Sequence, residues 1–166
     1  KIKKCSKLAY SLGLEVHAGH GLDYKTTKIL TKIKYIKEFN IGHFLIGESI
    51  LYGFRNIIRD RSVDIIQPDL TLCGMTETLR IAAMASAYDI TVIPHCSGVY
   101  AYHFGIASTL TPFNEFINLH PKATEVVPIF GKMFTNEPVP IKGEVTLNDL
   151  PGFGAELNPE VELEKI

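Results

Sequence analysis

Apolar residues recur along the first part of the chain with two different periods. Residues 3–12 place them at i, i+3, i+4 and i+7, which predicts one face of a helix that ends at Gly13. Residues 14–18 (LEVHA) predict a short strand, and residues 26–37 predict a second helix with its lysines in solvent. The apolar run at residues 43–47 (HFLIG) predicts a second strand.

The central stretch has the order strand, loop, helix, strand. Residues 63–67 (VDIIQ) and 90–94 (ITVIP) predict strands, and residues 71–89 between them hold a loop and a long helix. Strands that alternate with helices at this spacing indicate parallel βα units. The predicted fold class is therefore α/β, with successive βα units that form roughly half a TIM barrel, because a full barrel typically needs about 250 residues.

After Tyr102 the apolar residues follow the periods of strands and helices less clearly. Residues 103–121 predict a helix followed by a turn, and residues 126–130 predict a further strand. Residues 136–161 are acidic and interrupted by Pro and Gly, which favours a C-terminal wrapping segment with turns.

Bulk composition limits the function classes. The 166 residues carry a net charge of −1, so no general field favours nucleic acid. No apolar run approaches the about 20 residues of a membrane span. Three cysteines at wide spacing are not a disulfide framework, which favours a reducing, cytoplasmic location. The chain opens on KIKKCSKLAY without Met, so we expect a fragment or an excised piece.

Charge is distributed unevenly along the chain. Residues 1–51 hold nine Lys, no Arg and four acids, a net charge of +5, whereas residues 52–166 hold 8 basic and 14 acidic residues, a net charge of −6. All nine prolines lie at Pro68 or later. This shift predicts two pieces of different origin, residues 1–51 and 52–166, packed as one domain.

An acid and an imidazole follow two neighbouring predicted strands. Asp69 comes just after the strand at residues 63–67, and His95 comes just after the strand at residues 90–94. Loops that follow neighbouring parallel strands open on the same edge of a sheet. A carboxylate that holds and polarises an imidazole is a general-base arrangement. The alternative for Asp69 is an N-cap of the following helix.

Glycine and histidine also gather in two earlier loops. His20 and Gly21 follow the first predicted strand, and Gly42 and His43 stand at the boundary of the second. Backbone N–H groups exposed in such loops suit phosphate, with His20 as an acid/base group. The alternative is that the glycines serve tight turns and the histidines satisfy local carbonyls.

Residues 7–51, with GLEVHAGHGLDY and FNIGHFLIGESI, resemble the last third of the pyridoxine 5′-phosphate synthase family, which has a TIM-barrel fold. The resemblance implies that His20 is a catalytic proton donor. It implies that Gly21, Gly42 and His43 contact a phosphate-bearing substrate. The family's earlier catalytic His and Glu would lie on strands outside this stretch.

Residues 52–166 resemble the C-terminal part of the L-rhamnonate dehydratase family of the enolase superfamily, through YGFRNII, VDIIQPDL, CGMTETLRIAA, VIPHCSGVYAYHF, PKATEVVPIFG and LPGFGAELNPEV. The resemblance implies that His95 is the acid/base residue, Asp69 its dyad partner and Glu115 a further active-site residue. It also implies a Mg²⁺-bound sugar acid, which loses the proton next to its carboxylate and then hydroxide.

The chain departs from that family's pattern at three places. One glycine, Gly74, stands where the family has two, and Cys96 stands where the family has glycine after the base. The metal-binding acids would lie on earlier strands. Glu48, after the predicted strand at residues 43–47, falls near the last of them and is a candidate ligand, with a solvated helix N-terminus as the alternative.

Three functions follow from these patterns. The first is a partial or chimeric sugar-acid dehydratase-like lyase, inactive alone. The second is binding of a phosphate-bearing substrate, as in pyridoxine 5′-phosphate synthase. The third is a non-catalytic scaffold. A half barrel leaves two open sheet edges, so we expect a homo-oligomer or a missing barrel half as partner, besides a small-molecule substrate.

Overall fold

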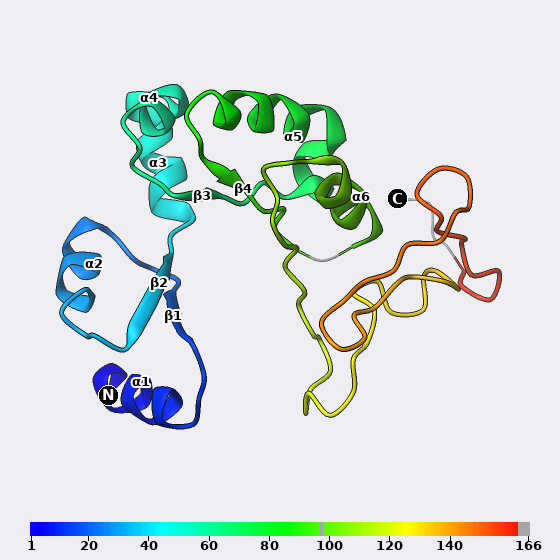
Figure 1. Cartoon of the computed structure of the whole chain (residues 1–166), viewed down its shortest axis with the longest axis horizontal. Helices are drawn as coiled ribbons and strands as arrows, with labels where there is room; N and C mark the ends of the chain where they lie inside the picture. Colours follow the sequence, from blue (N-terminus) through cyan, green and yellow to red (C-terminus); the bar gives the residue numbers. More distant parts are fainter. Residues whose placement is uncertain (97, 163–166) are drawn as a thin grey trace. The chain divides into compact units, whose positions relative to one another are not determined.

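A computed structural model describes residues 1–96 and 98–162, and its elements are drawn in Figure 1. The chain divides into two compact units, Lys1–Asp60 and Arg61–Ile166. Each unit is built from strands and helices in alternation, and every strand pair is parallel. The predicted α/β class with successive βα units is confirmed.

Unit 1, Lys1–Asp60, contains a two-stranded parallel sheet in which Gly19 pairs with Asn40. The helix α2 begins where the Asp23 carboxylate accepts a hydrogen bond from the N–H of Thr26 at 2.6 Å. Its elements are α1 (Ile2–Ser11), β1 (Val16–Gly19), α2 (Tyr24–Leu30), β2 (Ile36–Asn40), α3 (His43–Tyr52) and α4 (Phe54–Arg59).

Unit 2, Arg61–Ile166, is organised around a second parallel pair, in which Ile65 and Ile66 face Thr91 and Val92. Helix α5 packs on β4 and on α6, as Figure 1 shows. Its elements are β3 (Ile65–Ile66), α5 (Leu70–Ser86), β4 (Thr91–Val92) and α6 (Val99–Ala107), followed by a long C-terminal segment that Figure 1 draws in yellow to red.

The hydrophobic core of unit 2 lies between the strands and the two helices. Val92 on β4, Ile93 directly after it, Ala85 on α5 and Phe104 on α6 are all buried. Because these side chains pack in one apolar core, the strand ends are held firmly at one edge. Among residues 1–96 and 98–162, none of the helices has the length and apolar character needed to cross a membrane.

The structure corrects the predicted elements around β2. Residues 43–47, predicted as a strand, form the first half of α3, and the strand is instead Ile36–Asn40. The predicted helix at residues 26–37 therefore ends early, at Leu30. A short apolar run fits a strand and a buried helix equally well, and here Gly42 precedes the helix as its N-cap.

The structure also corrects the region after the second βα unit. The helix predicted at residues 103–121 begins earlier, at Val99, and ends at Ala107. The strand predicted at residues 126–130 does not form among the described residues. The remaining segment wraps without long strands, as predicted, through turns and the single bridges Phe134–Leu157 and Ile141–Glu144.

Candidate active site

Three extended stretches of unit 2 run side by side and end at one edge. Asp69 and His95 pair as a parallel β-bridge, and the N–H of His95 donates to the carbonyl of Pro68 at 2.9 Å. On the other side of β4, the N–H of Val92 donates to Leu110 at 3.2 Å. This last contact starts a stretch that carries Glu115 to the same edge as His95.

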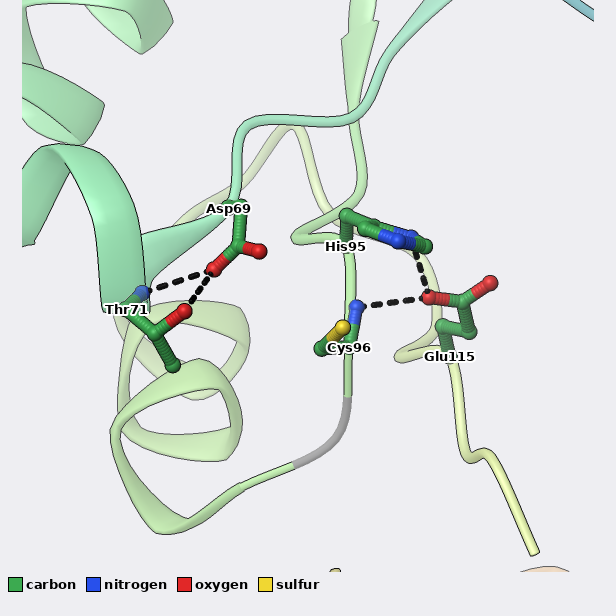
Figure 2. Close-up of polar contacts among 5 residues, drawn as sticks. All are labelled: Asp69, Thr71, His95, Cys96 and Glu115. Carbon is green, nitrogen blue, oxygen red and sulfur yellow. Dashed lines mark hydrogen bonds and ion pairs between the residues drawn. The ribbon is translucent and has the colours of Figure 1, made fainter. Parts of the chain in front are cut away.

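The His95 imidazole and the Glu115 carboxylate are in direct polar contact at this edge. His95 Nδ1 lies 2.9 Å from Glu115 Oε2, and the backbone N–H of Cys96 donates to the same oxygen at 2.7 Å (Figure 2). The carboxylate is therefore fixed by two contacts. The side chain of His95 is 46% exposed, so part of the ring faces solvent.

Asp69 stands at the start of α5 as its N-cap. Its carboxylate accepts from the N–H of Thr71 at 2.8 Å and from the Thr71 hydroxyl at 2.5 Å (Figure 2). The predicted alternative, an N-cap, is thus realised. The structure brings Asp69 next to His95 through the backbone, whereas the side chain that contacts the imidazole is Glu115.

Cys96 adopts an unusual backbone conformation directly after His95. Its φ is +61°, in the left-handed region that glycine enters without steric cost. This is the position at which the resemblance to the dehydratase family implies glycine. Burial raises the pKa of the Cys96 thiol, and the nearby carboxylates of Asp69 and Glu115 raise it further, so the thiol stays protonated at neutral pH.

The candidate phosphate loops of unit 1 follow adjacent parallel strands. His20 and Gly21 come directly after β1, and Gly42 and His43 come directly after β2. Both His20 and Gly21 have positive φ, +63° and +64°. The paired strand ends bring the two loops to one edge of the sheet, with the histidines and glycines exposed. This arrangement follows from the corrected position of β2, because the strand predicted at residues 43–47 would have placed Gly42 and His43 at its start.

Glu48 lies within α3 and does not follow a strand, so the structural basis of its predicted metal role is wrong. Mg²⁺ takes about six oxygen ligands and uses carboxylates to hold it. Within residues 1–96 and 98–162, no group of three or more His, Cys, Asp and Glu side chains is placed to hold a metal ion. The described residues of this chain therefore show no complete ligand set for Mg²⁺.

Sequence reasoning assigned Glu115 to the site only through resemblance and missed its contact with His95. The stretch before it has no alternation of apolar and polar residues. One local signal exists: Thr111 precedes Pro112, and a residue before proline favours an extended backbone. The Thr111 hydroxyl donates to the carbonyl of Val92 at 2.6 Å, which fastens this extended stretch to β4.

Comparison with known protein families gives two matches. A family profile described as enolase C-terminal domain-like matches residues 46–161. A second profile, described as pyridoxal phosphate biosynthesis protein PdxJ, matches residues 1–67. Both resemblances predicted from the sequence are confirmed. The matches overlap, so the join predicted between residues 51 and 52 stays a prediction.

Individual relatives point the same way. An L-rhamnonate dehydratase of Saccharopolyspora erythraea is 50% identical over 119 residues, which cover 71% of this chain and 30% of that protein. The crystal structure of L-rhamnonate dehydratase from Gibberella zeae matches with 38% identity and a TM-score of 0.66, over 95% of this chain and 41% of that one. Its complex with Mg matches with 36% identity and a TM-score of 0.69, over 95% and 39%. The chain thus spans well under half the length of these relatives.

Proposed function

The chain belongs to the enolase C-terminal domain-like family over residues 46–161, and from this premise we propose that it carries the acid/base group of a sugar-acid dehydratase. The substrate class is a sugar acid of the L-rhamnonate kind, on which the matched relatives act by name. The proposed reaction is removal of the proton next to the carboxylate, followed by loss of water.

One observation carries the proposal: the contact of 2.9 Å between His95 Nδ1 and Glu115 Oε2. A carboxylate beside Nδ1 favours the tautomer that carries its hydrogen there, because that N–H can then donate to it. In that tautomer Nε2 carries the lone pair, and the ring is half-exposed. This is the arrangement that a general base requires.

The His95 imidazole carries out both proton transfers. Nε2 of His95 takes the proton from the carbon next to the carboxylate, and the C–H electron pair stays on the substrate. When the neighbouring C–O bond breaks, the imidazolium gives its proton to the departing hydroxide, and water leaves. Glu115 stabilises the charged ring between the two steps, because a nearby carboxylate favours the imidazolium.

We keep Asp69 in the proposal as a second carboxylate that acts on the His95 imidazole. Its position beside His95 in the β-bridge supports this role. Its bonds to Thr71 hold the carboxylate at the start of α5, so it acts on the ring through its charge. Because the described residues do not supply a Mg²⁺ ligand set, no step is assigned to a metal.

The test is exchange of the proton next to the carboxylate of L-rhamnonate in deuterated water, followed by NMR. His95→Asn should lower the exchange rate by at least about 10²-fold, the usual contribution of a positioned base. Glu115→Gln should lower it by about tenfold, because the partner that orients the ring is weakened. His120→Asn, which changes a histidine outside the site, is the matched control. Exchange that survives His95→Asn would disprove the assignment.

A second function is supported by the match of residues 1–67 to the pyridoxal phosphate biosynthesis profile. We propose that the loops after β1 and β2 bind a phosphate group through backbone N–H groups at Gly21 and Gly42, with His20 as proton donor and His43 as a further contact. Gly42 is the N-cap of α3, and because glycine has no side chain, none of its atoms can cap the N–H groups at the start of that helix.

Inorganic phosphate tests this second function. The amide signals of Gly21 and Gly42 should shift during an NMR titration, while that of Gly13, which follows α1, should stay in place. Unchanged signals at Gly21 and Gly42 would rule out phosphate binding here. If neither phosphate nor L-rhamnonate gives a response and sedimentation shows a tight dimer, the remaining hypothesis, a non-catalytic oligomerising scaffold, is favoured.

A further inference from the structure

The extended stretch of residues 110–115, here called the outer stretch, lies along the side of β4 that faces away from β3. The N–H of Val92 donates to the carbonyl of Leu110 in this stretch at 3.2 Å. The next residue on the chain, Ile93, turns to the opposite side and donates to the carbonyl of Ile66 at 3.0 Å. The outer stretch therefore takes the place of a third parallel strand, although it forms only the start of a ladder.

Proline interrupts the backbone pairing of the outer stretch with β4. In a parallel ladder, a residue whose N–H donates to one partner accepts at its carbonyl from the residue two positions further along the partner strand. Because Val92 donates to Leu110, its carbonyl would accept from the N–H of residue 112. That residue is Pro112, which has no N–H. Val92 is fully buried, so its carbonyl needs a donor from the protein itself.

The hydroxyl of Thr111 supplies the missing donor. It donates to the carbonyl of Val92 at 2.6 Å, in a hydrogen bond that is buried. A side chain thus makes the bond that the backbone of Pro112 cannot make. Leaving a buried carbonyl without a partner costs more than an ordinary hydrogen bond contributes, so this one hydroxyl holds the outer stretch in its place along β4.

The same register brings a carboxylate to the end of β4. Four residues separate Val92 from Cys96, and four separate Thr111 from Glu115. The pairing of Val92 with Thr111 therefore continues as a pairing of Cys96 with Glu115. The structure shows this second pairing directly, because the N–H of Cys96 donates to the Glu115 carboxylate at 2.7 Å (Figure 2).

A shift of the outer stretch by one residue would take the carboxylate away from His95. It would bring Asn114 or Phe116 opposite Cys96, and neither side chain carries a negative charge. Successive side chains of an extended stretch point to opposite faces, so Glu115 would also turn away from the edge. The contact of 2.9 Å between His95 Nδ1 and Glu115 Oε2 therefore depends on the register.

We propose that Thr111 is a positioning residue of the acid/base edge. Its hydroxyl replaces the donor that Pro112 lacks, and so fixes the register that holds Glu115 against His95. This role rests on the proposed function, in which Glu115 favours the tautomer of His95 that carries its hydrogen on Nδ1. Thr111 acts on the imidazole through β4 and Glu115. Loss of its hydroxyl should therefore shift His95 towards the tautomer with hydrogen on Nε2.

Nitrogen-15 NMR of the His95 ring in the full chain tests this role, at a pH above that at which the ring loses its charge. Thr111→Val keeps the shape of the side chain, removes the hydroxyl and should shift the ring towards the Nε2–H tautomer. Thr111→Ser keeps the hydroxyl and should keep the original tautomer. Thr78→Val is the matched control, because it removes a buried hydroxyl that donates to the carbonyl of Gly74 within α5. It should leave the tautomer unchanged.

The double variant Thr111→Val, Pro112→Ala is the most specific test. Alanine at position 112 restores the backbone N–H of a regular ladder, so the carbonyl of Val92 regains a donor without the hydroxyl. The double variant should therefore return to the original tautomer, even if Thr111→Val alone fails to fold. A double variant that fails to fold, or that folds with His95 in the Nε2–H tautomer, would overturn the proposal.

Proton exchange on L-rhamnonate separates this proposal from the proposed function. Thr111→Val should lower the exchange rate by about tenfold, as Glu115→Gln does, and the double variant should restore it. A tautomer that shifts in Thr111→Val, in a chain that shows no exchange at all, would keep the positioning role and remove the proposed chemistry. A tautomer and an exchange rate that both survive Thr111→Val would remove the positioning role and keep His95 as the base.

Discussion

The two units of this chain use the same βα construction, yet they bury their apolar side chains to very different extents. In unit 1, Leu12 is 69% exposed and Ile29 is 57% exposed although both lie on or beside helices. In unit 2, Val92 and Ile93 are 0% and 2% exposed. Because burial of apolar surface is the main stabilising contribution in a domain, unit 2 should hold most of the folding free energy.

The candidate sites differ in the same way. In unit 2, two contacts fix the Glu115 carboxylate against His95 and the backbone of Cys96. In unit 1, the candidate site rests on backbone N–H groups in the loops at Gly21 and Gly42. A catalytic group needs neighbours that hold it within a fraction of an ångström, and a packed core supplies them. The comparison teaches that packing, more than the presence of suitable residues, separates the stronger candidate site from the weaker one.

The largest expected effect concerns core packing. Ile93→Ala removes a buried side chain from unit 2 and should cost about 2–5 kcal/mol of unfolding free energy. Ile29→Ala, the same substitution on an exposed face of α2 in unit 1, should stay within about 0.5 kcal/mol. Urea unfolding followed through NMR signals of each unit measures both. Equal effects of the two substitutions would contradict the difference in packing.

The next effect depends on the backbone alone. Gly74 interrupts α5 with φ +72° and ψ 167°, and an added Cβ there would meet nothing within 4 Å. Gly74→Ala should therefore destabilise unit 2 by about 1–3 kcal/mol through strain only. Gly47 lies in α3 with equally open surroundings, and Gly47→Ala should stabilise that helix by about 0.5–1 kcal/mol. The same urea experiment compares them, and a loss in both variants would refute the backbone explanation.

Sequence periodicity predicted part of this architecture well. It located α1, β1 and the strand–helix–strand core of unit 2, because there the apolar period and the flanking turn residues agree. It failed at residues 43–47, where a uniformly apolar run has no period that separates strand from helix. The polar residues of Ile36–Asn40 fitted the pattern of an exposed helix face, although they lie on a strand with one exposed side.

The candidate site could be predicted only in part. The positions of Asp69 and His95 after two strands were enough to place them at one edge, because parallel strands share their carboxyl ends. The role of Glu115 depends on backbone contacts between a non-periodic stretch and β4, and the sequence carries no pattern for such contacts. The aromatic cluster of Tyr100, Phe130 and Phe153 also escaped prediction, since its rings meet only through the wrapping of the C-terminal segment.

A smaller effect tests the strained residue next to the candidate base. Cys96→Gly relieves the positive φ of +61° at this position, and the gain is partly offset by the greater freedom of glycine in the unfolded chain. We expect unit 2 to gain about 0.5 kcal/mol. The amide signal of residue 96 should keep the shift typical of its hydrogen bond to Glu115. A loss of stability would show that the packing of the Cys96 side chain stabilises unit 2 by more than its backbone strain destabilises it.

The smallest expected effect is a pH dependence of stability that has opposite signs in the two units. The N–H of Thr26, which bonds to the Asp23 carboxylate, lowers the pKa of Asp23 below its ordinary value of 3.8. The stability that this carboxylate gives to unit 1 is therefore present above pH 3.8 and is lost as the pH falls through the lower folded-state pKa. Burial instead raises the pKa of Glu137 above 4.5, although the N–H groups of Phe130 and Ile129 oppose the shift.

Glu137 therefore has the opposite sign. Its contribution to unit 2 is most favourable below pH 4.5, where the carboxyl is neutral in both states, and declines as the pH rises through the folded-state pKa. Acidification should weaken the start of α2 while it strengthens the C-terminal segment. Urea midpoints of each unit at several pH values measure the two trends, and Asp23→Asn and Glu137→Gln should each remove only their own. If both units follow one common trend that neither variant changes, these two carboxyls do not govern the pH response.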